Sequence, residues 1–436
     1  MPLCVFTALL LILGVILQVV AGAALGWYPS RIGGPAYWLD DHLYQPVLGL
    51  LSPVPDALAI AGLLFLLALV LSFVGYALGA RWALRVGAGR ERHFWLILGV
   101  QIMLCLWLLV QPYLSSQDIF SYAFYSHIFA WYQDNPYVAV PRDYPFDPLF
   151  SAIFWKDQTS NYGPLWTYLS ALAPLVAGAR VGWTLLVLKA ITIGSAVAGT
   201  PLLWSTLRRL RPERRVIGTL LYAWNPLLLI ESAEAGHNDV VMACLLIASL
   251  WFWCRRRRGA SLTMLILAAL VKYVAIALVP LYLLAWWKES GESPWRVLVR
   301  TALVGLGLGI VAFAPVFAGP ATFAVVGFGS NSLAYTNSPM ELVFREARVF
   351  LGESSEVADL PLHYDGHWIG SQPAAILWSF PDEQRGTGIL LPAGTSLLVV
   401  EAQTGSWVHV YEPKLGRFGF IRANLTHPIP VPTSWV

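Results

Sequence analysis

Residues that could accept or donate a proton are concentrated between positions 115 and 166. This stretch reads Ser-Ser-Gln-Asp-Ile-Phe-Ser-Tyr at 115–122, Asp-Asn-Pro-Tyr at 134–137 and Asn-Tyr-Gly-Pro-Leu-Trp at 161–166. Asp118 lies just beyond a strongly apolar run, where an ionisable group is costly and by default suggests function. Its carboxylate could take the proton from an acceptor hydroxyl. The same segment also fits the N-cap of an aromatic-rich interfacial helix, and both interpretations stay open.

A second polar cluster lies between two later apolar runs. It contains Glu231, Glu234, His237, Asn238 and Asp239. Asp239 can cap the helix that follows, and a lone histidine is often structural, but the acidic and amide neighbours raise the case for function. Residues of these types can also bind a divalent metal, although no spacing here supports a ligand set, and we predict no certain cofactor.

Lys272 stands between Val271 and Tyr273 in the apolar stretch 260–287. A lysine in such a run needs a partner, water or an anion, and a phosphate suits it as a point charge. Snorkelling to the interface is the alternative. Carboxylates, aromatic rings and one cation together fit a lipid-phosphate donor and a polyol acceptor. A carboxylate would activate the acceptor, and the cation would stabilise the departing phosphate.

The composition indicates what must position these residues. Of 436 residues, 57% are hydrophobic and 12% are charged, the net charge is +3 and the mean hydropathy is +0.62. This excludes an ordinary cytosolic enzyme, a disordered chain and a nucleic-acid binder. It predicts an all-α polytopic membrane protein in contact with membrane lipids. Apolar runs of membrane length lie at 3–27, 55–80, 94–113, 179–206, 215–232, 239–254 and 296–318.

Basic clusters predict the orientation of these runs. Arginines gather after the second run, at 81–92, and again at 208–215 and 255–258. The positive-inside rule makes all three clusters cytoplasmic, together with the N-terminus. The loop 28–54 is then outside, and the short apolar piece 165–177 is re-entrant or interfacial.

The stretch 260–287 is either one long tilted helix or two short helices that meet at Lys272 and Tyr273. The charges of the loop 288–296 favour two helices. We therefore predict about nine crossings plus re-entrant helices in a membrane domain over 1–318. The chain beyond residue 318 is then extracytoplasmic.

The end of the chain changes character. A linker over 319–364 carries a short amphipathic helix around Met340–Phe350. Residues 365–430 read as a small β-barrel domain with short strands separated by turns. The expected strands are Ala375–Trp378, Ser396–Glu401, Trp407–Tyr411 and Gly416–Ile421.

Three segments of this end resemble a bacterial SH3-like domain: Leu391-Pro-Ala-Gly-Thr395, Gly405-Ser-Trp407-Val-His-Val410 and Gly419-Phe-Ile-Arg422. The resemblance implies cell-wall glycan or peptide as a partner. A structural appendage is an equal alternative.

Ordered motifs over about 115–340 carry a second resemblance. They are Asp118, Tyr122, Asn135-Pro136-Tyr137, Tyr162-Gly163-Pro164, Trp224-Asn225-Pro226, Gly236-His237-Asn238-Asp239, Leu270-Val271-Lys272 and Asn337-Ser338-Pro339. In this order they resemble the bacterial GT-C superfamily glycosyltransferases, and most closely the polyprenol-phosphate-mannose-dependent mannosyltransferases of the mycobacterial and actinobacterial type.

The resemblance implies an inverting transfer of a hexose, with mannose favoured, from a polyprenyl-phosphate donor to a glycan or lipid-linked acceptor on the outer face. It assigns Asp118 as the catalytic base. It implies substrate binding by Tyr122, Asn135, Tyr137, Tyr162, His237, Asn238, Asp239, Lys272 and Asn337. Members usually carry further membrane helices after the Asn-Ser-Pro motif, and the β-module that stands there in this chain puts the donor groove in question.

Two other functions stay open. A transporter or flippase of lipid-linked sugars would suit a membrane protein with polar clusters. Such transporters often show repeated halves with broken helices at matching positions. This chain shows no internal repeat, and its polar residues fall in loops. A non-catalytic cell-wall-anchoring protein, with the β-module as its working part, is the other alternative.

Overall fold

The computed structural model consists of two compact units, Met1–Gly327 and Phe328–Val436. We describe each unit by itself. The residues that the structure describes are 7, 9–14, 57–109, 116, 118–145, 147–150, 152–153, 155–178, 180–323, 368–371, 375–378, 388–393, 395–404, 407–412 and 417–429.

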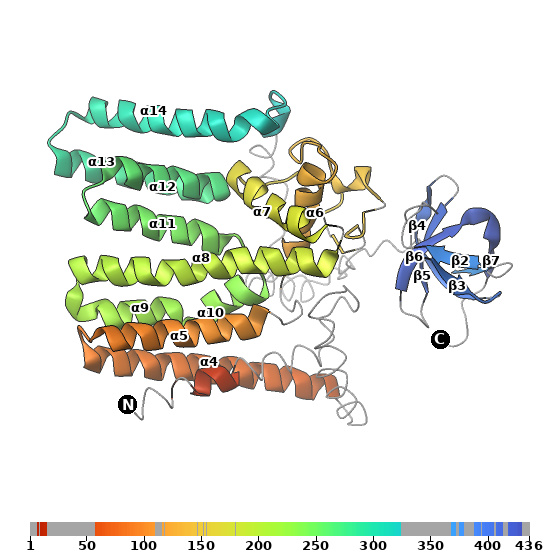
Figure 1. Cartoon of the computed structure of the whole chain (residues 1–436), viewed down its shortest axis with the longest axis horizontal. Helices are drawn as coiled ribbons and strands as arrows, with labels where there is room; N and C mark the ends of the chain where they lie inside the picture. Colours follow the sequence, from red (N-terminus) through yellow and green to blue (C-terminus); the bar gives the residue numbers. More distant parts are fainter. Residues whose placement is uncertain are drawn as a thin grey trace, which may run out of the picture. The chain divides into compact units, whose positions relative to one another are not determined.

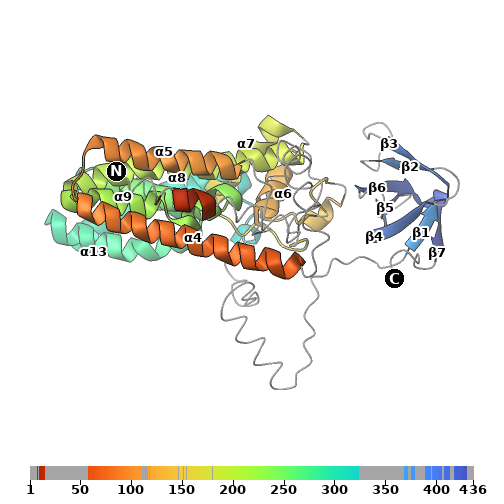
Figure 2. The ribbon, with the colours of Figure 1, turned by 90° about the horizontal axis from the view of Figure 1, so that it is seen from below.

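The first unit is a bundle of helices that run side by side, with α6 and α7 gathered at one end (Figures 1 and 2). The α-helices are α4 (Ala57–Val86), α5 (Glu91–Leu109), α6 (Asp118–Ala130), α7 (Pro164–Ala177), α8 (Val181–Leu210), α9 (Arg215–Ala223), α10 (Pro226–Leu229), α11 (Asp239–Cys254), α12 (Arg258–Val271), α13 (Val279–Ser290) and α14 (Pro294–Phe313). A π-helical turn, η4 (Ile230–Glu234), follows α10, and a 3₁₀ segment, η5 (Tyr273–Leu278), joins α12 to α13. Shorter 3₁₀ turns are η2 (Pro141–Asp143), η3 (Pro212–Arg214), η6 (Ala314–Val316) and η7 (Ala321–Phe323).

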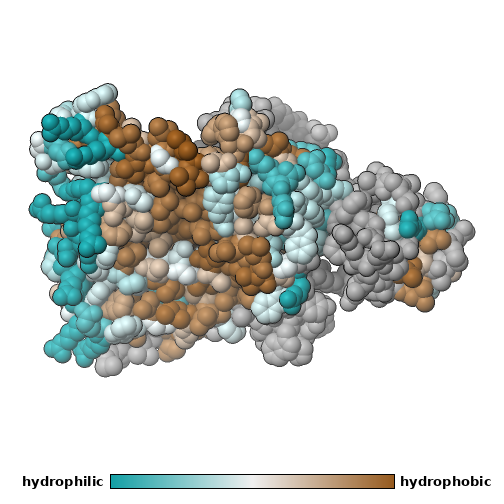
Figure 3. All heavy atoms as spheres, turned by 45° about the horizontal axis from the view of Figure 1, so that its top comes forward, coloured by the Kyte–Doolittle hydropathy of each residue, from teal (hydrophilic) through white to brown (hydrophobic). Residues whose placement is uncertain are grey.

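Several helices have the length and apolar character of membrane spans. Figure 3 shows the corresponding apolar band beside a strongly hydrophilic end of the bundle. In the described part of the chain four helices qualify by length and composition, and a bent pair is a fifth if it counts as one span. The four are Leu63–Val86, Glu91–Leu109, Val181–Leu210 and Pro294–Val316. This supports the prediction of a multi-pass membrane protein.

The described residues do not reach the predicted count of about nine crossings. The run 215–232 forms the bent pair, Pro212–Ala223 and Pro226–Glu234, with a 47° angle at the break. The run 239–254 forms a helix of 16 residues, and the stretch 260–287 forms helices of 14 and 12 residues. A straight span needs about 20 residues, so in the described part of the chain these segments are shorter than complete straight spans.

The chain reverses direction after α12, which confirms the two-helix interpretation of 260–287. Helix α12 ends at Val271, Lys272 is extended, and α13 runs back beside α12. The Tyr282 hydroxyl donates a 3.0 Å hydrogen bond to the Arg258 carbonyl, and the Arg258 guanidinium contacts Glu289. The start of α12 and the end of α13 therefore lie at the same end of the bundle.

Polar contacts supplement apolar packing between the long helices. Gln101 on α5 is fully buried, and its amide donates to the Ala196 carbonyl of α8 at 3.3 Å. The Thr200 hydroxyl donates to Gln101 Oε1 at 2.6 Å, and Trp224 Nε1 donates to the Ile97 carbonyl at 3.0 Å. Helices in lipid associate through close packing and such hydrogen bonds, because lipid is as apolar as the side chains themselves.

The bundle has one arginine-rich end. Arg255 donates to Ser205 Oγ at 3.1 Å and Arg209 donates to the Cys254 carbonyl at 3.2 Å, which joins the ends of α8 and α11. Asp239 and Lys272, at the other ends of α11 and α12, also contact each other. With a rise of 1.5 Å per residue, helices of this length separate the two ends by about 20 Å.

Some predicted elements lie outside the described residues. Of the predicted first span 3–27, the structure describes residue 7 and residues 9–14, which are helical. The loop 28–54, the linker beyond residue 323 and the helix around Met340–Phe350 are not among the described residues. Their predictions stand untested.

The second unit contains a seven-stranded sheet with the order β3-β2-β6-β5-β4-β1-β7, in which all neighbouring strands are antiparallel. The strands are β1 (Trp368–Ser371), β2 (Ala375–Trp378), β3 (Gly388–Leu391), β4 (Ser396–Thr404), β5 (Trp407–Glu412), β6 (Arg417–Arg422) and β7 (Thr426–Ile429). Leu397, Val410 and Ile421 are buried in its core.

Four of these strands match the predicted strands, but the prediction of a closed barrel is wrong for the described residues. β3 and β7 are the two edges of the sheet. Alternation of apolar residues locates strands, whereas closure depends on stagger and tilt that a local pattern does not contain. The resemblance to SH3-like domains stays a prediction.

Candidate active site

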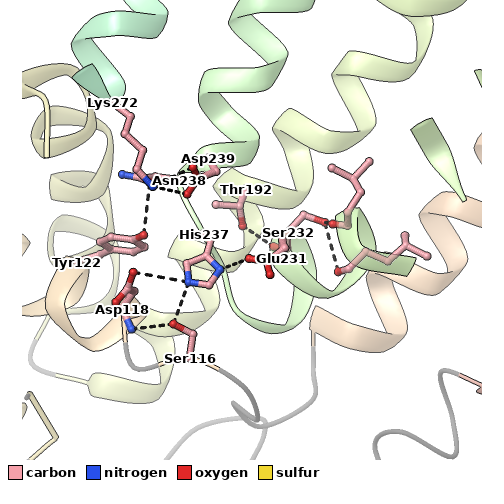
Figure 4. A network of polar contacts seen from close by, with 12 residues as sticks. Ser116, Asp118, Tyr122, Thr192, Glu231, Ser232, His237, Asn238, Asp239 and Lys272 are labelled. Atoms are coloured by element: carbon pink, nitrogen blue, oxygen red, sulfur yellow. Dashed lines mark hydrogen bonds and ion pairs between the residues drawn. The ribbon is translucent and has the colours of Figure 1, made fainter. Parts of the chain in front are cut away.

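The predicted polar residues converge at the end of the bundle that carries α6 and α7. Figure 4 shows Asp118 at the start of α6, His237 and Asn238 in the turn before α11, and Lys272 at the end of α12. Tyr122, one turn along α6, and Asp239, the first residue of α11, complete the group. The structure thus brings six of the predicted residues together from three separate segments.

His237 links the acidic residues of this cluster. Its Nδ1 contacts Glu231 Oε2, and its Nε2 lies 2.8 Å from Ser116 Oγ and 3.7 Å from Asp118 Oδ2. Ser116 in turn accepts a 3.2 Å hydrogen bond from the backbone N–H of Asp118. The Asp118 side chain remains 44% exposed, so an incoming hydroxyl can reach it, whereas the His237 side chain is only 15% exposed.

The surroundings of His237 favour its charged form. Burial alone would lower the pKa of His237, but the hydrogen bond to Glu231 and the negative charges of Glu231, Asp118 and Asp239 raise this pKa above its ordinary value. As an imidazolium, His237 donates from both ring nitrogens, to Glu231 and to Ser116. Its positive charge then lies beside the Asp118 carboxylate.

Lys272 and Asp239 form an ion pair at the edge of the cluster. Lys272 Nζ lies 2.8 Å from Asp239 Oδ1 and 2.7 Å from Oδ2. The two side chains are 37% and 46% exposed, so solvent screens the pair and an anion can compete for the lysine. Lys272, the predicted phosphate-binding residue, is therefore paired with the carboxylate of Asp239 in this structure.

Tyr122 and Asn238 form the buried floor of the cluster. The Tyr122 hydroxyl donates to Asn238 Oδ1 at 3.4 Å, and both residues are almost fully buried. Burial, followed by nearby phenol and carboxylate groups, raises the pKa of Tyr122 well above its ordinary value, so the phenol remains a donor. Among the described residues, Asn238 Nδ2 has no hydrogen-bond acceptor, which leaves one buried donor available.

Tyr162 and Tyr137 support this floor from the segment between α6 and α7. The Tyr162 ring packs edge-on against Tyr122, with ring centroids 4.7 Å apart. The Tyr162 carbonyl accepts hydrogen bonds from the Tyr137 hydroxyl at 2.8 Å and from the Tyr273 hydroxyl at 3.3 Å. These contacts give both predicted residues a positioning role in the structure, while their predicted binding to substrate remains a hypothesis.

Gly163 ties the Tyr-Gly-Pro motif to the Leu-Val-Lys motif. Its backbone N–H donates to the Val271 carbonyl at 3.0 Å. A Cβ atom at this position would lie 2.0 Å from the Leu270 carbonyl oxygen, a backbone atom that cannot move aside easily. Only glycine permits this approach, and it brings the backbones of the two motifs into contact next to Lys272.

Asn135 has its observed contacts away from the cluster. Its Nδ2 donates to the Val316 carbonyl at 2.7 Å, and its Oδ1 accepts from the Tyr137 N–H at 3.0 Å. It therefore joins the segment between α6 and α7 to η6, which directly follows α14. Asn337, the last predicted binding residue, lies outside the described residues.

The site also uses residues that sequence reasoning did not select as functional. Ser116 lies within the predicted segment 115–122, and Glu231 lies within the second polar cluster, but neither was expected to contact His237. The one available signal for Glu231 was its place in the same polar loop. In the described ranges, no group of three His, Cys, Asp or Glu residues is arranged to hold a metal ion.

Comparison with known proteins adds a family to this geometry. Residues 9–288 match the family model described as alpha-(1->6)-mannopyranosyltransferase, N-terminal domain. This chain belongs to that family. The matched region contains the cluster around Asp118, His237 and Lys272.

One curated relative in this mannopyranosyltransferase family is alpha-(1->6)-mannopyranosyltransferase A of Mycobacterium tuberculosis. The two sequences are 28% identical over 254 residues, which cover 56% of this chain and 47% of the relative. The chain therefore spans about half the length of that relative. No solved structure matches the chain significantly. Family membership and the helices long enough to span a membrane together support a membrane glycosyltransferase of the mannosyltransferase type.

Proposed function

We propose that this protein transfers mannose from a polyprenyl-phosphate donor to a glycan or lipid-linked acceptor. The observation that carries the proposal is the contact between Asp118 and His237, with the Lys272 cation in the same cluster. Such a transfer requires a carboxylate that the acceptor can reach, here Asp118, and a cation for the phosphate, here Lys272. His237 supplies a second cation beside the carboxylate. Family membership supports mannose as the sugar.

In the proposed reaction Asp118 is the general base. It accepts the proton of the acceptor hydroxyl, whose oxygen then bonds to the anomeric carbon of the donor sugar. The bond from that carbon to the phosphate oxygen breaks, and the phosphate leaves with the electron pair. Because this is one displacement from the opposite face, the configuration at the anomeric carbon inverts.

His237 and Lys272 have distinct electrostatic roles in this reaction. The His237 imidazolium, held by Glu231, keeps its positive charge beside the Asp118 carboxylate before transfer. Lys272 exchanges Asp239 for the donor phosphate and offsets the negative charge that develops as the phosphate leaves. The phosphate and Asp239 compete for the same ammonium group, so the donor must bind more strongly than the internal carboxylate.

We further propose that the reaction takes place on the outer face of the membrane. The arginine-rich ends of α8 and α11 suit the cytoplasmic side under the positive-inside rule. At the opposite end of these helices, Asp239 begins α11 and Lys272 follows the last residue of α12. This orientation agrees with a donor that presents its sugar outside the cell.

The test is a reconstituted transfer assay. The purified full chain in proteoliposomes receives polyprenyl-phospho-mannose labelled in the sugar, together with an α-mannoside acceptor. Polyprenyl-phospho-glucose, labelled in the same way, is the control donor. We expect label in the acceptor product from the mannose donor. Movement of labelled donor between leaflets without any product would contradict the proposal and favour a flippase.

A further inference from the structure

A buried lysine and a buried glutamate lie next to the turn that carries His237 in the proposed active site. Lys189 on α8 is 3% exposed and Glu234, the last residue of η4, is 0% exposed. Ionisable groups inside a membrane bundle are expensive and persist where they pair or serve function. The proposed transfer reaction uses neither residue, and Lys189 escaped the sequence analysis although it interrupts an apolar run as Lys272 does.

The two charges compensate each other. Lys189 and Glu234 interact electrostatically across the interface between α8 and η4. The same two segments are joined a second time, because the Thr192 hydroxyl donates a 2.5 Å hydrogen bond to the Ser232 carbonyl. Helix α8 therefore contacts the η4 turn in two ways. The Lys189 charge faces Glu234, and the Thr192 hydroxyl bonds to the backbone of η4.

The η4 turn is the part of the site that most needs such support. A π-helical turn breaks the regular hydrogen-bond ladder of an α-helix, and such turns are frequent at functional sites. This turn also carries Glu231, the residue that contacts His237 Nδ1. A displacement of η4 would therefore separate Glu231 from His237.

Gly236 brings the backbone before His237 against the same lysine. Its φ of +68° lies in the left-handed region that favours glycine. A Cβ atom there would lie 2.8 Å from Ile119 Cδ1 and 3.5 Å from Lys189 Cγ. The Lys189 stem thus packs under the turn that carries His237, while its charged end interacts with Glu234.

We propose that Lys189 and Glu234 are a positioning pair that holds η4 and the His237 turn in the geometry required by Asp118. The pair acts through Glu231 and His237 and does not touch the substrate. Removal of one partner leaves a buried uncompensated charge, whereas removal of both leaves an uncharged interface. The effect on activity rests on the proposed transfer function, but the effect on His237 does not.

The test measures the protonation of His237 itself. The full chain is labelled with ¹³C-histidine, and the His237 signal is assigned by its loss in the His237→Gln variant. The variants are Lys189→Met, Glu234→Gln, the double variant and the charge-conserving Lys189→Arg. Ser195→Ala serves as the control, since this serine lies on the same helix and donates to the Ile191 carbonyl.

We expect His237 to titrate at lower pH in the double variant, because it loses the fixed Glu231 carboxylate. We expect Lys189→Arg and Ser195→Ala to keep the wild-type titration. An unchanged His237 titration in a folded double variant would overturn the proposal, since the pair would then serve stability alone. The double variant keeps this test available if either single variant fails to fold.

Activity distinguishes this proposal from the proposed function. If both hold, the single variants lose about 100-fold in transfer rate, as expected for a displaced catalytic group. A shifted His237 titration with no mannose transfer by the wild type would overturn the proposed function and leave the positioning pair supported. Normal wild-type transfer with an unshifted titration would overturn the positioning pair alone.

Discussion

His237 Nε2 lies 3.7 Å from Asp118 Oδ2, although the two residues belong to motifs on opposite sides of helices α7 and α8 in the sequence. His237 is fixed from its other ring nitrogen by Glu231. Asp118, the proposed base, thus lies next to a cation, His237, which is itself held in place by its contact with Glu231. The relation makes the protonation of His237 the main pH-dependent feature of the site.

The first prediction concerns activity at high pH. The charges of Glu231, Asp118 and Asp239 and the hydrogen bond to Glu231 raise the pKa of His237, so it remains charged somewhat above pH 6.5. We expect kcat/KM to fall as the pH rises through this pKa, because a neutral His237 donates from one ring nitrogen only and no longer holds both Glu231 and Ser116 next to Asp118. His237→Gln should lower kcat about 100-fold and remove this alkaline limb.

The control for this measurement is His93→Gln. His93 lies on α5, away from the candidate site, and its contacts are with Arg90 and Trp82. The pH–rate profile of this variant should match that of the wild type. An alkaline limb that persists in His237→Gln would mean that another group controls it.

The second prediction concerns stability. A histidine whose pKa is raised by folding contributes stabilisation that is fully present below its unfolded pKa of about 6.5 and is lost as the pH rises through the folded pKa. Thermal unfolding of the purified chain should therefore show a stability component that declines above about pH 6.5. This component should be missing from His237→Gln. The same decline in both proteins would exclude His237 as its source.

The third prediction concerns the contact between α7 and α12. Gly163→Ala would place a methyl group 2.0 Å from the Leu270 carbonyl oxygen and should destabilise the fold by about 3 kcal/mol. Gly99→Ala is the matched control, because nothing lies within 4 Å of the added methyl group in helix α5. That control should be neutral or stabilising by about 0.5–1 kcal/mol. Equal thermal stability of the two variants would contradict the close approach.

The fourth prediction concerns the donor phosphate. Lys272→Met should lower kcat/KM for the polyprenyl-phosphate donor about 100-fold while the KM for the acceptor changes little. Lys288→Met, at the exposed end of α13, should leave both parameters unchanged. Initial rates at varied donor and acceptor concentrations separate the two effects. A change confined to the acceptor KM would reassign Lys272 to the acceptor.

Much of the helical framework is predictable from the sequence, because apolar runs and arginine clusters are local signals. The charges of the loop 288–296 also favour the reversal at Lys272, because Lys272 by itself fits one long helix as well as two short ones. The number of complete spans does not follow from the sequence, since hydropathy does not reveal the 47° bend between α9 and the α10–η4 segment. The bounds of α11, by contrast, match the predicted run 239–254, although its 16 residues are fewer than a straight span needs.

The candidate site shows the same division between local and distant information. Asp118, His237 and Lys272 stand out because polar residues next to apolar runs are conspicuous. The ion pair of Lys272 with Asp239, and the contacts of His237 with Ser116 and Glu231, depend on how α6, α11 and α12 pack. Asn135 shared a motif with Tyr137, yet it bonds to Val316, far along the chain.

The most direct measurement of the central claim is mannose transfer by Asp118→Asn. Asparagine preserves the shape of the side chain but cannot accept the hydroxyl proton, so transfer should fall at least about 1,000-fold. Asp157→Asn, an exposed carboxylate that pairs with Arg142, is the matched control and should transfer mannose at the wild-type rate. Both variants must insert and unfold like the wild type. Wild-type transfer by Asp118→Asn would contradict the account.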